Sequence, residues 1–150
     1  MQRFKFELQS ILDLRIREED EAKAFLMMCE LELQKANADF KDKKEELVNF
    51  QTREKGSRKD EPTSAATLKF SVSWRNSIKL DILKLGRQIQ EISMDVARAR
   101  QLFTQATIKR QALEKLHDKK KEEWQKEFNK QEQKFLDELA QTRHNIRKIS

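Results

Sequence analysis

The chain of 150 residues contains two glycines, one proline and one cysteine, and 39% of its residues are charged. So few turn-forming residues exclude an α/β or all-β fold, in which turns recur about every ten residues. Disorder is disfavoured because 37% of the residues are hydrophobic and the charges are mixed in sign. A composition rich in charged and helix-forming residues is typical of a long helix or coiled coil.

The first third of the chain carries apolar residues at alternating steps of four and three positions. The positions of this series are Leu8, Leu12, Arg15, Glu19, Ala22, Leu26, Cys29, Leu33, Ala36, Phe40, Lys43, Leu47 and Phe50. Such a 3.5-residue repeat predicts a coiled-coil seam, the stripe that faces a partner helix. The three charged residues in it interrupt the apolar stripe, and polar seam residues fix the register at some cost in stability.

A more regular seam follows in the second half of the chain. Nine successive seam positions are apolar: Ile78, Ile82, Leu85, Ile89, Ile92, Val96, Ala99, Phe103 and Ala106. Arg110 and His117 interrupt the pattern on either side of Leu113. The apolar stripe then continues with a shifted phase through Trp124, Phe128, Phe135, Leu139, Ile146 and Ile149. Because a four-residue shift locally unwinds a supercoil, we interpret it as a change of packing partner.

The polar segment between the two seams contains the only proline, Pro62, and predicts a turn. The sequence therefore predicts one all-α domain over residues 1–150, an antiparallel two-helix coiled-coil hairpin. We expect a first helix at about 2–54, a turn at 55–66 and a second helix at about 67–148. Thr63 or Ser64 could cap the second helix. Clear helical periodicity begins only at about Ser73, because the apolar residues before it alternate with period two.

The second predicted helix is much longer than the first, so that it overhangs the hairpin. With the turn near residue 60, Leu8 pairs near residue 110. Residues after about Leu116 are then expected to lack an intramolecular partner. An exposed apolar stripe on such an overhang marks an interaction site.

No catalytic or ligand-binding motif is recognisable, so the sequence predicts neither an enzyme, a cofactor nor a bound metal. Gly56 and Gly86 lack the context of a phosphate-binding loop. His117 and His144 are 27 residues apart, about 40 Å along a helix, and are expected to be solvated or seam residues rather than ligands. Cys29 lies at a seam position, where a thiol behaves as a small apolar group.

The cysteine content and the hydropathy pattern predict a cytoplasmic protein. A single cysteine excludes an intramolecular disulfide and fits a reducing compartment. No apolar run approaches the roughly 18–20 residues of a membrane span. The segment Met1–Phe6 lacks the continuous apolar core of a signal peptide.

The net charge of +6 is unevenly distributed along the chain. Residues 1–52 contain nine Lys/Arg against twelve Asp/Glu, whereas residues 63–150 contain 19 against 11. A solvated face is the simplest explanation of the basic excess, and an acidic partner surface is the functional one. Nucleic acid is a less favoured partner, because acidic residues alternate with the lysines of residues 119–127 and would repel phosphates.

Two groups of residues, one near each end of the chain, carry a family resemblance: Phe4–Arg15 with the acidic run Glu18–Glu21, and Leu113–Leu116, Trp124 and Gln131–Ala140 with Arg143. In these residues the chain resembles the FliJ family of the flagellar type III export apparatus. The resemblance implies a two-helix coiled coil similar to the central stalk of rotary ATPases. It also implies three partners: the hexameric export ATPase FliI, the export gate protein FlhA and the export chaperones. The membrane would be reached only indirectly, through the gate.

The same resemblance implies two groups of partner-binding residues. The ATPase-facing end would consist of Phe4, Phe6, Leu8, Leu12, Arg15, Leu113, Leu116, Trp124 and Phe128. The gate-facing surface would consist of Trp74, Ile78, Asp81 and Leu85. From the sequence alone, two other functions stay open: a structural scaffold that dimerises through its seams, and a basic helical nucleic-acid binder.

Overall fold

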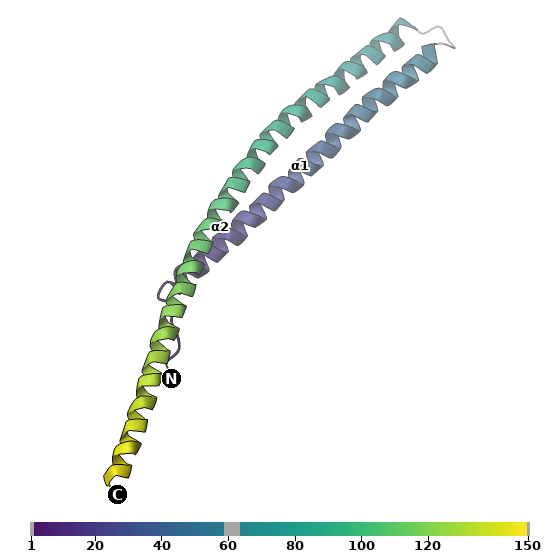
Figure 1. Cartoon of the computed structure of the whole chain (residues 1–150). Helices are drawn as coiled ribbons and strands as arrows, with labels where there is room; N and C mark the ends of the chain where they lie inside the picture. Colours follow the sequence, from purple (N-terminus) through teal and green to yellow (C-terminus); the bar gives the residue numbers. More distant parts are fainter. Residues whose placement is uncertain (1, 59–63, 150) are drawn as a thin grey trace. The chain divides into compact units, whose positions relative to one another are not determined.

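The structure, a computed structural model, describes residues 2–58 and 64–149 and contains two long helices. They are α1, Gln9–Arg58, and α2, Ala65–Ile149 (Figure 1). No strand occurs within the described residues. The predicted all-α class and helical hairpin are therefore confirmed.

The first helix begins later than the sequence predicted. Residues 2–6 are not helical, and α1 starts only at Gln9, whose N–H donates a hydrogen bond of 3.1 Å to the carbonyl of Phe6. At its other end α1 continues to Arg58, so Gly56 belongs to the helix rather than to the turn. Residues 59–63, the middle of the predicted turn, lie outside the described residues.

The second helix begins earlier than its periodicity indicated. Ser64 caps it, since the Ser64 hydroxyl accepts a hydrogen bond of 3.2 Å from the Thr67 N–H. The helix is continuous from Ala65, close to the predicted start at about residue 67 and ahead of the clear periodicity that begins at about Ser73. The other candidate cap, Thr63, lies outside the described residues.

The chain divides into two compact units. One is formed by Met1–Asp20 with Gln105–Ser150, and the other by Glu21–Thr104. In the second unit Arg100 lies 3.6 Å from Glu30, and Lys43 lies 3.8 Å from Asp81. Increasing residue numbers in α1 thus pair with decreasing numbers in α2, which confirms an antiparallel arrangement there.

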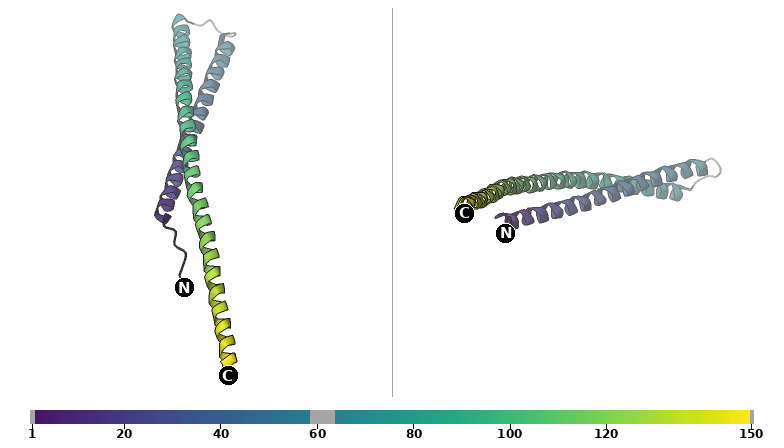
Figure 2. Two further views of the ribbon diagram at one scale, coloured as in Figure 1. Left: turned by 60° about the vertical axis from the view of Figure 1, so that its left-hand side comes forward. Right: turned by 60° about the horizontal axis from the view of Figure 1, so that its bottom comes forward.

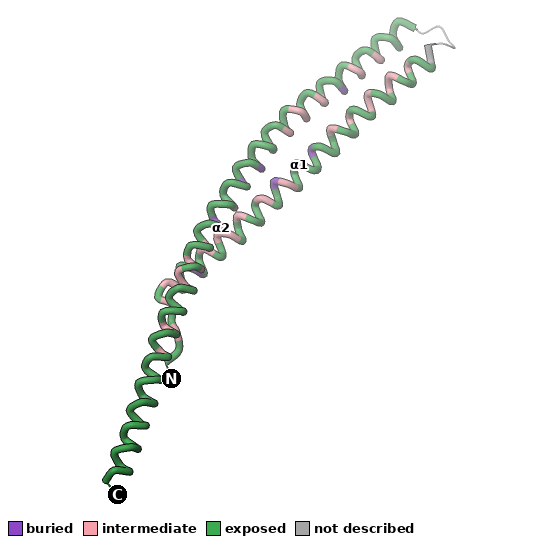
Figure 3. The backbone as a smooth tube through the Cα atoms, in the orientation of Figure 1, coloured by how far each residue is buried: buried purple, intermediate pink, exposed green. Residues whose placement is uncertain are grey.

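The core of the Glu21–Thr104 unit is one line of seam side chains. Cys29, Val96 and Ala99 are buried against one another. Every predicted seam position from Leu8 to Phe50 and from Ile78 to Ala106 is buried or half-buried (Figure 3). The coiled-coil seams predicted from the sequence are therefore the helix interface. Burial raises the pKa of the Cys29 thiol, with nearby carboxylates adding to the effect, so the uncharged thiol is favoured in this core.

Gly86 faces the ring of Phe40 across this interface. A Cβ placed on Gly86 would lie 3.9 Å from the nearest ring carbon, which is an ordinary van der Waals distance. The close approach of the two helices therefore does not require a glycine at position 86, because the interface has room for a Cβ there.

Candidate partner-binding site

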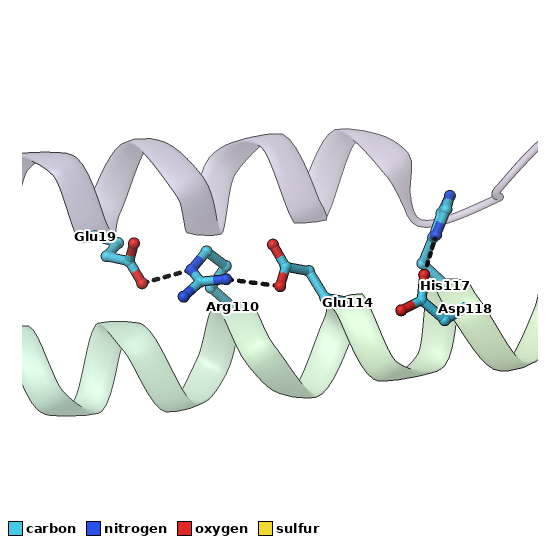
Figure 4. Close-up of polar contacts among 5 residues, drawn as sticks. All are labelled: Glu19, Arg110, Glu114, His117 and Asp118. Atoms are coloured by element: carbon cyan, nitrogen blue, oxygen red, sulfur yellow. Dashed lines mark hydrogen bonds and ion pairs between the residues drawn. The ribbon is translucent and has the colours of Figure 1, made fainter.

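A charged layer crosses the unit formed by Met1–Asp20 and Gln105–Ser150. The Arg110 guanidinium donates hydrogen bonds of 2.5 Å to Glu19 of α1 and 2.6 Å to Glu114 of α2 (Figure 4). Only 22% of the Arg110 side chain and 18% of the Glu19 side chain are exposed. Two residues that interrupted the predicted seams, one on each helix, thus neutralise each other.

The hydrogen bonds to Glu19 and then Glu114 raise the pKa of the Arg110 guanidinium. The group is therefore held firmly in its charged form. Lys43 and Asp81 repeat the arrangement in the other unit, where Lys43 also lies 3.2 Å from Glu46. Because each charge needs its own partner on the facing helix, these layers fix the register of the pairing.

Removing one member of the Glu19–Arg110 pair should destabilise the protein more than removing both. We expect Glu19→Leu and Arg110→Leu each to lower the melting temperature, because each leaves a charge in the seam without its partner from the facing helix. The double variant has an apolar seam and should melt above either single variant. Thermal unfolding followed by circular dichroism at 222 nm gives the melting temperatures of the three variants. A double variant that melts below both single variants would contradict the prediction.

The non-helical N-terminal segment runs alongside α2 (Figure 2). Its aromatic rings pack on that helix. The Phe4 ring centroid lies 5.5 Å from that of His117 and 6.1 Å from that of Trp124. The Phe6 ring meets His117 edge-on at 5.1 Å. Trp124 in turn stacks on Phe128 at 5.3 Å. These ring contacts, rather than a helical seam, attach the segment to α2.

The intramolecular contacts therefore extend further along α2 than the sequence predicted. We expected no partner after about Leu116, yet Trp124 contacts Phe4. The reason is the register of the pairing: the sequence analysis expected Leu8 to pair near residue 110, which is wrong, because Arg110 pairs with Glu19 instead. The N-terminal segment therefore lies further along α2, and Leu8 shares a pocket with Leu116 and Lys120.

Beyond Phe128, every described residue of α2 is exposed (Figure 3). The predicted overhang is thus present but begins after Phe128. Five large apolar side chains lie on it, with 47–87% of each exposed: Phe135, Leu136, Leu139, Ile146 and Ile149.

The structure gathers the whole predicted ATPase-facing group in one unit. All nine residues belong to the segments Met1–Asp20 and Gln105–Ser150. Leu12 is buried, whereas Phe4, Phe6, Leu8, Leu113, Leu116, Trp124 and Phe128 are half-buried. Arg15 forms an ion pair of 2.9 Å with Glu18.

The predicted gate-facing group is divided between surface and interior. Ile78 is buried, with 2% exposed, and Leu85 is half-buried. Trp74 is 45% exposed and stacks on Phe70 at 6.4 Å. Asp81 pairs with Lys43 of α1 at 3.8 Å. Trp74 is therefore the apolar member of this group that a partner can reach, and its exposed neighbour Phe70, which was not predicted, adds to that surface.

Sequence reasoning missed the pocket between the N-terminal segment and α2. Its lining includes Lys5, Glu7 and Lys120, which the sequence did not single out. A signal was present, because Phe4, Phe6 and Leu8 alternate with charged residues, the period-two pattern of an extended segment. Within residues 2–58 and 64–149, no group of three or more His, Cys, Asp or Glu could hold a metal ion. Neither described helix contains a stretch apolar enough to cross a membrane.

The fold defines a class of protein, an all-α helical hairpin, and this one exposes apolar side chains on its helices. The family model for the flagellar FliJ protein matches residues 4–148, nearly the whole chain. The chain therefore belongs to the FliJ family, and it is a component of the flagellar export apparatus, which serves flagellum biogenesis and protein export. Neither the curated proteins nor the solved structures compared with it gave a match.

Proposed function

We propose that this protein is the stalk of a flagellar export ATPase similar to FliI. The end formed by the N-terminal segment and the C-terminal part of α2 enters the ATPase hexamer. It promotes the assembly and activity of that ring. The main support is the part of α2 beyond Phe128, where Phe135, Leu139 and Ile146 are exposed along a stretch of helix whose described residues are all exposed. An exposed apolar stripe of this kind is expected where a partner binds.

Charge supports the same proposal. Residues 119–148 contain nine Lys/Arg against six Asp/Glu. A basic rod end is complementary to an acidic pore, and such complementarity accelerates encounter and orients the partner. A rod that is not symmetric touches each subunit of a ring differently, and it can couple the states of those subunits only through such unequal contacts.

We further propose that the same chain links the ATPase to the export gate, a protein similar to FlhA, and to export chaperones. The exposed pair Phe70 and Trp74 near the start of α2 is the apolar surface available for the gate. In this proposal the protein acts in the cytoplasm, next to the membrane-embedded gate. Its action is binding rather than catalysis, and it needs no cofactor.

The decisive experiment is the ATP hydrolysis rate of the purified cognate export ATPase with and without this protein, measured together with sedimentation. We expect a higher rate and a shift toward the hexamer. If rate and assembly do not change, and this protein sediments as a stable dimer, it is instead a scaffold that dimerises through its apolar stripe.

A further inference from the structure

The pocket beneath the N-terminal segment has walls from two separate parts of the chain. Phe4–Leu8 forms one wall, and Leu116 and Lys120 of α2 form the other. The pocket has a volume of about 210 Å³. It therefore offers room for one apolar side chain of a partner, in contact with the segment and with α2 at the same time.

The walls and the rim of this pocket differ in character. The walls are apolar, since Phe4, Phe6, Leu8 and Leu116 are all half-buried. The rim is charged, because Lys5, Glu7 and Lys120 are exposed. Lysines thus flank the opening from both the segment and the helix. An apolar side chain carried next to a carboxylate is the group that matches this arrangement.

Lys120 is available to such a carboxylate. Its nearest acidic neighbour, Glu123, lies 3.8 Å away, and both side chains are more than half exposed. An exposed pair of this geometry contributes little to stability, so a partner carboxylate can replace it at small cost.

Ring contacts, rather than backbone hydrogen bonds, set the shape of the pocket. Among the described residues, the backbone of residues 2–5 makes no hydrogen bond to another backbone group. Phe4 and Phe6 instead rest on His117 and Trp124. A side chain in the pocket would therefore add contacts that hold the segment on α2.

We propose that this pocket is a socket for one large apolar side chain of the export ATPase, next to a carboxylate that pairs with Lys120. The inference rests on the proposed function and names the chemistry by which the ATPase is recognised. Binding energy in interfaces concentrates where a side chain fills a desolvated pocket. The aromatic walls favour an aliphatic or aromatic occupant.

Two variants and one matched control test the socket. Lys120→Glu reverses the charge at the rim, whereas Lys121→Glu makes the same change at an exposed neighbour outside the lining. We expect Lys120→Glu to raise the Kd for the ATPase by at least about tenfold and Lys121→Glu by less than about threefold. Leu116→Trp fills the pocket without changing the net charge and should weaken binding similarly. Circular dichroism verifies that each variant is folded.

The outcomes separate the socket from the proposed function. Equal weakening by Lys120→Glu and Lys121→Glu would overturn the socket in favour of general electrostatic attraction. Unchanged binding by folded Lys120→Glu and Leu116→Trp would also overturn it, while the stalk function stands. If the unmodified protein does not bind the ATPase at all, the proposed function fails, and the inference fails with it. If Leu116→Trp turns a dimer into a monomer, the occupant is a second copy of this chain, which again overturns the proposal.

Discussion

Replacing Ala99 with aspartate should unfold the protein, whereas the same change at Ala97 should be tolerated. Ala99 is fully buried, with 0% exposed, and packs in the cluster with Cys29 and Val96. An aspartate there buries a charge without a partner, which costs about 3 kcal/mol or more. Ala97, two residues away on the same helix, is exposed. There only the lower helix propensity of aspartate acts, about 0.7 kcal/mol or less.

Thermal unfolding followed by circular dichroism at 222 nm measures both variants. Because the substitutions are chemically identical and lie in the same stretch of α2, their difference reports burial alone. A similar melting temperature for the two variants would show that the interface at Ala99 is open to water, contrary to the structure.

Removing the two apolar side chains Phe135 and Leu139 should abolish stimulation of the export ATPase without affecting folding. Both side chains are largely exposed, 60% for Phe135 and 47% for Leu139. The double variant Phe135→Ala with Leu139→Ala therefore removes little packing within the protein. If they are anchors in the ATPase interface, their loss should weaken binding by at least about tenfold. The melting temperature should stay close to that of the unmodified protein.

The matched control is the pair Gln133→Ala and Gln141→Ala. Each lies two positions away from its counterpart and so on the opposite side of the helix, because side chains repeat every 3.6 residues. Titration of the ATPase with each double variant gives affinity and maximal rate. Equal losses from the two pairs would show that no particular face of α2 is recognised.

The residues of the helix interface could be predicted from the sequence because the 3.5-residue repeat is a strong physical signal. A single partner helix can cover only one stripe of a helix. The seam positions from Leu8 to Phe50 mark that stripe in the first half of the chain, and those from Ile78 to Ala106 mark it in the second half. The partners of the charged seam residues could not be predicted, because they depend on the register. The structure pairs Arg110 with Glu19, and Lys43 with Asp81.

Period-two alternation, in contrast, predicted local structure poorly. It occurs at Phe4–Leu8, which is not helical up to Phe6, and also at Leu68–Trp74, which is helical. The difference lies in what surrounds each stretch. Ser64 caps the helix before Leu68, whereas the rings of Phe4 and Phe6 find partners on α2. Those ring contacts join residues that are distant in the chain, so a short local pattern cannot predict them. The ATPase-facing and gate-facing residues stay proposals, since they came from the family resemblance.

The single line of buried seam side chains has a thermodynamic consequence. The chain exposes 12816 Å² of surface, against about 8,000 Å² for a globular protein of the same mass. Unfolding therefore uncovers less surface than it does in a globular protein, so the heat capacity change should fall below the usual roughly 12 cal/mol/K per residue. The enthalpy and entropy of unfolding should be smaller as well. A given loss of free energy then lowers the melting temperature further than it would in a globular protein of this length.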